Sequence, residues 1–285
     1  MVWVVASEAG GAYAEAAALI RAETGNDTRV DWWQGTLRDL PNAPAVLPRA
    51  VVVLGAAALR WVTDKVHADA SWSRVPVIAA LLPRASFDAI VAAKPAVNIS
   101  AVLLDQPVDR YFELLRKALP GHRRVGVLLG QDTRALKPQM SKAAAARGLS
   151  LVTASVQDTD LYSALQTVLD EADALLLLPD SSLFDAGVLQ NMLITAYRRR
   201  IPVLTYSAAH VRAGATLALH TTPAQAARQT SAVLRDVLRG SPLPAARQSE
   251  PFSVAINTTV SRSLGLALES EQTLEGAIRR QESAR

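Results

Sequence analysis

Continuous apolar runs alternate with amphipathic stretches along the chain. The runs at 51–54, 77–80, 125–129 and 174–178 are as long as ordinary strands and contain no charged residue, which is typical of parallel strands covered on both faces. The stretches between them carry apolar residues at helical spacing. This alternation predicts an α/β protein.

One strand-helix-strand pattern occurs twice. Residues 50–80 begin with AVVVLG and end with SRVPVIAA, and residues 173–207 begin with DALLLLPD and end with RRRIPVLTYS. The repeat predicts two lobes of like topology, each a doubly wound parallel sheet between helices. Ligands of such sheets bind beyond the carboxyl ends of the strands, so we expect a binding cleft between the lobes.

Composition narrows the class of protein further. The chain has 285 residues, enough for two domains, with half of them hydrophobic, a net charge of +4 and no cysteine. No apolar run is long enough to cross a membrane, and the dispersed charge argues against nucleic acid as a partner. We therefore expect a protein without disulfides or thiolate metal sites.

Signatures of catalysis and metal binding are missing from the sequence. The histidines lie at 67, 122, 210 and 220, without the spacing of metal ligands. There is no G-x-S-x-G, Walker or G-x-G-x-x-G motif. We expect no cofactor, no metal and no enzymatic activity.

Four stretches carry a resemblance to a known family: NISAVLLDQPVDRYFELLRKALPGHRRVGVLLG (98–130), DALLLLPDSSLF (173–184), RRRIPVLTYSAAHVRAGATLAL (199–219) and RGSPLPAARQSEPFSVAINTTVSRSLGLAL (239–268). Their order and spacing resemble the ABC transporter substrate-binding proteins of the tryptophan/tyrosine type, which have the periplasmic-binding-protein-like type I fold.

The resemblance implies two lobes joined by three hinge crossings, near Leu104–Pro107, Ser207–Val211 and Ser241–Glu250. Lobe 1 is then expected to comprise residues 1–105 and 208–245, and lobe 2 residues 106–207 and 246–285. It further implies a small-molecule ligand bound by lobe closure, ABC permease and ATPase subunits as partners, and a periplasmic or extracytoplasmic location, the signal peptide having been removed.

The sequence departs from this family at positions that recognise ligand. The family usually has a hydroxyl residue after the glycine where Ala56 follows Gly55, and often an Asp-Pro pair where this chain has Leu82-Pro83. The strand that ends in Tyr-Asn in the family ends here in Leu129-Gly130, and Asp180-Ser181 replaces Asp-Asn, so only the aspartate is kept. These departures predict a less polar ligand than a free aromatic amino acid.

The candidate ligand-binding residues all follow predicted strands: Ser7, Gly10, Gly11, Gly55, Ala56, Leu82, Gly130, Asp180, Ser181 and Tyr206. Free amides at helix N-termini favour anions, the Asp180 carboxylate suits an ammonium group and the Tyr206 ring offers a stacking surface. Each has a structural alternative. Ser7 and Asp180 could be helix caps, the glycines could serve tight turns or close packing, and Tyr206 could be an interface aromatic.

Two functions agree with these observations. The chain is expected to be the solute-binding protein of an ABC importer, or alternatively a sensing module of the same fold that signals to a partner protein.

Overall fold

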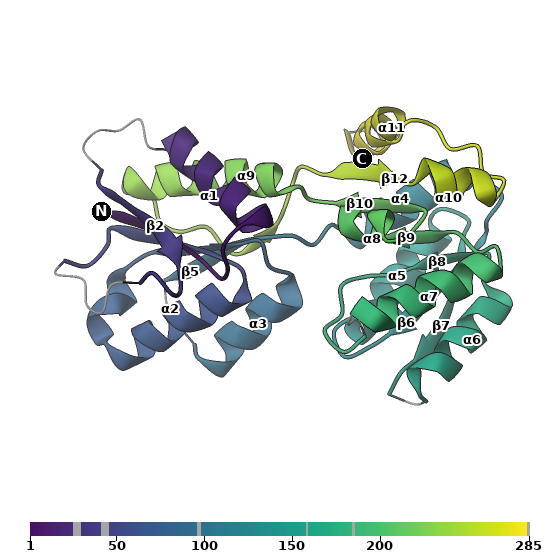
Figure 1. The fold of residues 1–285 in the computed structure, drawn as a ribbon, viewed down its shortest axis with the longest axis horizontal. Helices are drawn as coiled ribbons and strands as arrows, with labels where there is room; N and C mark the ends of the chain where they lie inside the picture. The colour runs from purple at the N-terminus through teal and green to yellow at the C-terminus, as the bar shows by residue number, and fades with distance from the viewer. Residues whose placement is uncertain (25–29, 41–45, 96–97, 158, 184–185, 284–285) are drawn as a thin grey trace. The chain divides into compact units, whose positions relative to one another are not determined.

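The computed structural model describes residues 1–283 except 25–29, 41–45, 96–97, 158 and 184–185. The chain divides into two compact units, residues 1–105 with 221–251 and residues 106–220 with 252–285 (Figure 1). Each unit has its own sheet and its own apolar clusters, as the repeated pattern predicts.

Unit 1 is a six-stranded sheet in the order β11-β5-β4-β3-β1-β2, with every pairing parallel. Its strands are β1 (Val2–Ala6), β2 (Trp32–Thr36), β3 (Ala50–Leu54), β4 (Val77–Ala80), β5 (Ile99–Leu103) and β11 (Arg247–Gln248). Its helices are α1 (Gly11–Thr24), α2 (Ala56–Ala68), the 3-10 turn η1 (Ala70–Arg74), α3 (Arg84–Ala93) and α9 (Pro223–Leu238).

Helices cover both faces of the first sheet, which explains the uninterrupted apolar strands. α1 and α9 pack on one face and α2 and α3 on the other, as Figure 1 shows. The adjacent Trp32 and Trp33 belong to the two opposite clusters, as the alternation of a strand requires.

Unit 2 repeats this arrangement in the order β12-β10-β9-β8-β6-β7. Its strands are β6 (Arg124–Leu129), β7 (Ser150–Ser155), β8 (Ala174–Leu176), β9 (Val203–Thr205), β10 (Leu217–His220) and β12 (Ser253–Ile256). Its helices are α4 (Val108–Ala118), the turn η2 (Arg134–Leu136), α5 (Lys137–Ala145), α6 (Leu161–Glu171), α7 (Ala186–Arg198), α8 (Ala208–Arg212), α10 (Thr258–Ser263) and α11 (Glu271–Ser283).

The prediction of two α/β lobes is confirmed. The strand-helix-strand pattern that occurs twice in the sequence corresponds to β3-α2-β4 in unit 1 and to β8-α7-β9 in unit 2. One edge departs from a purely parallel plan, because β12 pairs antiparallel with β10. Cores lie on both faces of this sheet: α4, α5 and α11 cover one, and α6 and α7 the other.

The structure draws two unit boundaries differently from the sequence prediction. Residues 208–220 belong to unit 2, because β10 pairs with β9 and supplies the fifth strand. Residues 246–251 belong to unit 1, because the segment expected to be a plain linker contains β11, which pairs with β5. The crossings therefore fall at 105–106, 220–221 and 251–252.

Candidate functional site

The carboxyl end of β1 supports the start of α2. The Ser7 hydroxyl accepts a hydrogen bond of 3.0 Å from the Ala58 amide, and the Ser7 amide donates to the Leu54 carbonyl at 2.9 Å. The residue in the N-cap position of α2 is Gly55, which has no side chain to make such a bond. Ser7, at the end of a neighbouring strand, thus caps α2 in place of the N-cap residue. The helix can therefore begin with Gly-Ala, which has no side chain able to cap it.

Gly55 is required by its backbone and by its surroundings. Its φ is +89°, and a Cβ placed on it would lie 2.7 Å from both the Ser7 hydroxyl and the Tyr13 hydroxyl. No L side chain fits this position without displacing one of those groups. Burial, with a contribution from the charge of Glu8, raises the pKa of Tyr13. Ser7, Tyr13 and Gly55 form one compact polar corner of unit 1.

Gly10 and Gly11 lie on the exposed surface beside that corner. Both have positive φ, +84° and +53°, and a Cβ at either would meet no atom within 4 Å. Their backbone is therefore open at the start of α1. Ala56 is half-buried in the first turn of α2.

Leu82 occupies a different place from the one expected of a ligand contact. Its side chain is 1 % exposed, in the cluster that contains Trp3 and Phe87, and its carbonyl accepts from the Leu104 amide at 3.1 Å. Leu82 therefore belongs to the core of unit 1. The preceding Leu81 has a φ of +57°, which is uncommon for a branched residue.

Asp105 is a polar residue at this edge that the sequence analysis did not single out. Its carboxylate accepts a hydrogen bond of 2.5 Å from the Arg84 amide at the start of α3. Burial raises the pKa of Asp105. The signal in the sequence is an aspartate directly after an apolar strand, and the predicted crossing at Leu104–Pro107 assigns its side chain no role.

In unit 2, two aspartates tie the loop after β6 to the loop after β8. We call Asp132, Thr133, Asp180, Ser181 and Ser182 the aspartate clasp. Asp180 Oδ2 accepts from the Asp132 amide at 3.0 Å and from the Thr133 amide and hydroxyl, each at 2.8 Å. Asp180 Oδ1 accepts from the Ser182 amide at 3.0 Å and its hydroxyl at 2.6 Å. Asp132 Oδ2 accepts in return from the Ser181 amide and hydroxyl, both at 2.7 Å.

Hydrogen bonds within unit 2 occupy both carboxylate oxygens of Asp180. The side chain is 6 % exposed and five donors surround its two oxygens. Burial alone would raise the pKa of Asp180, but hydrogen bonds from Ser182 and Thr133 outweigh it and place the pKa below its usual value. This geometry favours the structural role of Asp180 over pairing with a ligand.

Gly130 leaves the space that the clasp fills. A Cβ at Gly130 would lie 2.4 Å from Asp180 Oδ1 and 2.5 Å from the Ser182 hydroxyl, so only glycine allows this approach. The Gly130 amide donates to the Thr133 hydroxyl at 3.0 Å. Ser181 is exposed at the rim of the same loop.

Tyr206 follows β9 and packs against a histidine. Its ring lies 4.8 Å from the His210 ring in an edge-on arrangement, and His210 Nδ1 is 2.7 Å from the Thr205 hydroxyl. Burial, together with the negative charge of Asp180, raises the pKa of Tyr206 to about 12. Burial also lowers the pKa of His210. Both rings are therefore uncharged at neutral pH, and they form an aromatic surface at a strand end.

The described residues contain no group of three or more histidine, cysteine or acidic side chains placed to hold a metal ion. In the same part of the chain, no helix is long and apolar enough to cross a membrane. The strand ends of both units thus carry backbone amides, hydroxyls, aromatic rings and internally bonded carboxylates.

Comparison with protein families decides the class. The model of the ABC transporter substrate binding protein family matches residues 66–278, which is well over half of the chain. The chain belongs to this family. ABC transporter substrate binding proteins bind solutes and are not enzymes, in agreement with the sequence prediction. No match was found among curated proteins.

Solved structures share the fold of this binding protein at low identity. A ligand-free, open substrate binding protein with adhesive properties from Clostridium difficile is 14 % identical, with a TM-score of 0.72 and coverage of 95 % of this chain and 96 % of that one. An ABC domain in complex with L-Trp from Streptococcus pneumonia is 15 % identical, with a TM-score of 0.66 and coverage of 96 % and 97 %. A conserved domain protein from Vibrio cholerae is 18 % identical, with a TM-score of 0.64 and coverage of 97 % of each chain.

Proposed function

We propose that this chain is the extracytoplasmic solute receptor of an ABC importer. It binds one small metabolite through loops at the strand carboxyl ends of both units, and closure of the units accompanies binding. The family match over residues 66–278 is the observation that carries this proposal. Permease and ATPase subunits are its expected partners.

The loops proposed to contact the ligand are those with open backbone or exposed polar groups. In unit 1 these are Ser7, Gly10, Gly11, Gly55 and Ala56, and in unit 2 they are Gly130, Ser181 and Tyr206. Asp180 contributes by shaping the second loop through the clasp, and Leu82 by filling the core below the first. The family resemblance and the position of these residues after parallel strands support the assignment.

We further propose that the ligand is less polar than a free amino acid. The clasp already occupies the carboxylate that would hold an ammonium group, and Ala56 and Leu82 stand where the family resemblance implies hydroxyl and carboxylate groups. A buried zwitterion without full hydrogen bonding is penalised by several kcal/mol, an order of magnitude taken from transfer of polar groups.

Free tryptophan, tyrosine and phenylalanine are therefore expected to bind weakly or not at all. Calorimetric titration of the purified protein measures this directly, and thermal shift extends it to a panel of uncharged metabolites. A ligand present at 100 times its Kd stabilises the folded state by about 2.7 kcal/mol. Micromolar binding of any of the three amino acids would show that other residues supply the missing polar contacts, and would overturn the proposed ligand class.

A sensing role is the second candidate, favoured by the replacement of polar groups at Ala56 and Leu82. Uptake of a ligand found in the screen separates the two functions. Loss of uptake in cells that lack this chain supports transport. Normal uptake with a lost cellular response to the ligand would instead assign the chain to sensing.

A further inference from the structure

The C-terminal helix α11 packs on unit 2 beside the two segments with which the chain enters that unit, after the first and the third crossing. Gln106 and Phe252 are the first residues of unit 2 after those crossings. Leu274 and Ile278 of α11 are buried in the same apolar cluster as Phe252 and Tyr111 of α4. Helix α11 thus contacts both entering segments through the core.

Two glutamates of α11 accept hydrogen bonds from the backbone amides on the outer edge of β12. The Val254 amide donates to Glu275 and the Ile256 amide to Glu271, each at 2.8 Å. The two glutamates are one helical turn apart, and the two amides point away from β10 because alternate residues of an antiparallel edge face outward. The helix therefore stands where a further strand would otherwise pair with the edge.

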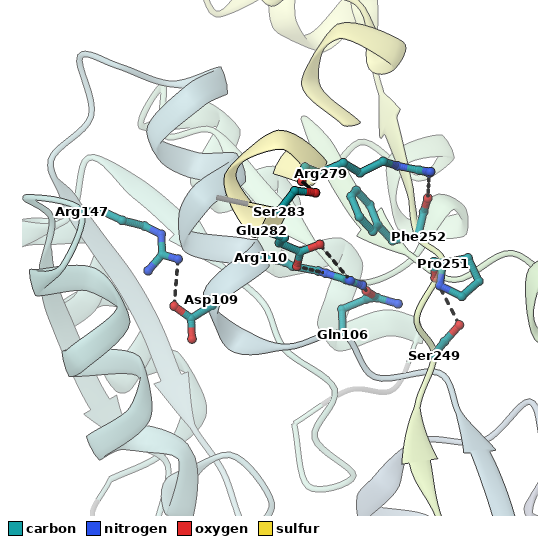
Figure 2. A network of polar contacts seen from close by, with 10 residues as sticks. All are labelled: Gln106, Asp109, Arg110, Arg147, Ser249, Pro251, Phe252, Arg279, Glu282 and Ser283. Atoms are coloured by element: carbon teal, nitrogen blue, oxygen red, sulfur yellow. Dashed lines mark hydrogen bonds and ion pairs between the residues drawn. The ribbon is translucent and has the colours of Figure 1, made fainter. Parts of the chain in front are cut away.

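Arg110 connects the first entering segment to the end of α11. Its Nε and Nη2 donate to the two carboxylate oxygens of Glu282 at 2.5 and 3.1 Å, and its Nη1 donates to Gln106 at 2.6 Å (Figure 2). The Arg110 side chain is 12 % exposed. A two-point arginine–carboxylate pair of this kind fixes orientation as well as distance.

The Phe252 ring connects the two entering segments to each other. The guanidinium of Arg110 lies 4.5 Å from the ring centroid and that of Arg279 lies 5.1 Å from it. Arg279 also donates to the Phe252 carbonyl at 3.4 Å, as Figure 2 shows. Cations within about 6 Å of an aromatic ring are attracted to it.

The unit 1 ends of the same crossings are also fixed close to the boundary. The Leu104 amide donates to the Leu82 carbonyl at 3.1 Å, and the Ser249 amide donates to the Leu103 carbonyl at 2.9 Å. Asp105 in the first crossing and Glu250 and Pro251 in the third therefore lie between anchors on the two units, a spacing that concentrates any change of backbone dihedral angles. The ring of Pro251 fixes its φ, so the change at that residue falls on ψ.

We propose that α11 is a hinge clamp. Through Glu271, Glu275, Arg279 and Glu282 it holds the entering segments 106–110 and 252–256 rigidly on unit 2. Hinge bending is then confined to the residues immediately before Gln106 and Phe252, and Arg110 is the positioning residue that joins the two anchor points.

Amide hydrogen exchange on the ligand-free protein tests the clamp, independently of what the protein binds. The variant Arg279→Ala/Glu282→Ala removes the contacts to Phe252 and Arg110. The control Arg280→Ala/Glu269→Ala removes one positive and one negative charge from exposed positions, Arg280 on α11 and Glu269 two residues before that helix begins. Clamp loss is expected to speed exchange of the Val254 and Arg110 amides by about tenfold, while the control changes it less than about twofold.

The Val127 amide, in the middle of β6, which pairs with a strand on each side, provides the internal reference. Unchanged exchange at Val127 with faster exchange at Val254 supports the clamp. Equal acceleration at both amides would show that α11 stabilises unit 2 as a whole, and equal behaviour of variant and control would show that these contacts hold nothing in place. Either result overturns the proposal.

The glutamates are tested by a second pair of variants. Glu271→Ala/Glu275→Ala removes the acceptors, and Glu271→Gln/Glu275→Gln keeps an acceptor oxygen at each position. Faster exchange of the Val254 and Ile256 amides in the alanine variant, with protection retained in the glutamine variant, supports the proposed edge contact. Unchanged protection in the alanine variant refutes it.

Discussion

Replacing Asp180 with alanine is expected to lower the free energy of unfolding of unit 2 by about 3–5 kcal/mol. The change removes the acceptor for three backbone amides, those of Asp132, Thr133 and Ser182, and both Asp180 and Thr133 are buried. A buried donor that loses its partner costs about 1–3 kcal/mol, and water that enters the space recovers part of the sum. Urea denaturation followed by circular dichroism measures the difference.

Asp160→Ala is the matched control for this prediction. Asp160 caps α6 in the same unit through the Ser163 amide at 3.0 Å, but it is exposed, so its loss is expected to destabilise the protein much less than the loss of Asp180. If Asp180→Ala costs no more than Asp160→Ala, the clasp is not a major source of stability. Asp180 would then again be a candidate for direct contact with the ligand.

The clasp also predicts how stability depends on pH. Asp180 has a pKa below its usual value in the folded protein, so the folded state favours the ionised form. The resulting stability is fully present above the unfolded-state pKa, near 3.9, and is lost as the pH falls through the lower folded-state pKa. Asp180→Ala is expected to remove this contribution, so the gap between variant and native protein narrows in acid.

Replacing Arg147 with alanine is expected to cost a similar 3–5 kcal/mol. Arg147 and Glu113 form an ion pair of 3.0 Å in which each side chain is 4 % exposed. Arg147 also donates to the Ala143 carbonyl and, as Figure 2 shows, to Asp109, each at 2.8 Å. Without the guanidinium, Glu113 keeps only the partly exposed Arg116 as an ionic partner among the described residues.

A double variant separates the effect of losing the ion pair from the effect of losing side-chain volume. Arg147→Met/Glu113→Gln removes both charges and keeps most of the volume, so it is expected to be more stable than the sum of its single changes predicts. Arg116→Ala serves as the control from the exposed side of the pair. Additive single changes would show that Glu113 and Arg147 are not coupled, and would contradict the buried pair as a source of stability.

The fold could be predicted from the sequence wherever local signals and core pattern agreed. The Asp160 cap and the apolar spacing that continues to Val168 and Leu169 predict a helix here from the sequence alone, and the structure has it at Leu161–Glu171. The bounds of the second strand, Trp32–Thr36, do not follow from its sequence. Its two tryptophans alternate equally well in either frame, and pairing with β1 decides the register.

The second crossing could not be placed from the sequence. No glycine or proline separates the strand Leu217–His220 from Thr221, and the strand ends before the capping box of Thr222 and Gln225 that begins α9. That helix packs on unit 1, so the chain must cross before it. Nothing local reveals which sheet the preceding strand joins.

The candidate site shows the same division between local and distant information. Ser7 and the Ala58 amide that it caps are 51 positions apart in the sequence, and the clasp joins its two loops through residues 47 to 49 positions apart. The candidate residues follow strands in the structure as the sequence predicts, since these positions are set by the α/β repeat. Whether each polar group faces inward or outward depends on partners that periodicity does not reveal.

The distribution of indole rings gives each unit its own optical signature. All five tryptophans belong to unit 1, and four of them form a contact group around Trp3, with ring centroids 5.4 Å from Trp33, 6.4 Å from Trp61 and 5.8 Å from Trp72. Unit 2 carries tyrosine and no tryptophan. Indole emission therefore records the state of the first sheet alone, while circular dichroism records both, and the native chain needs no label to separate the two signals.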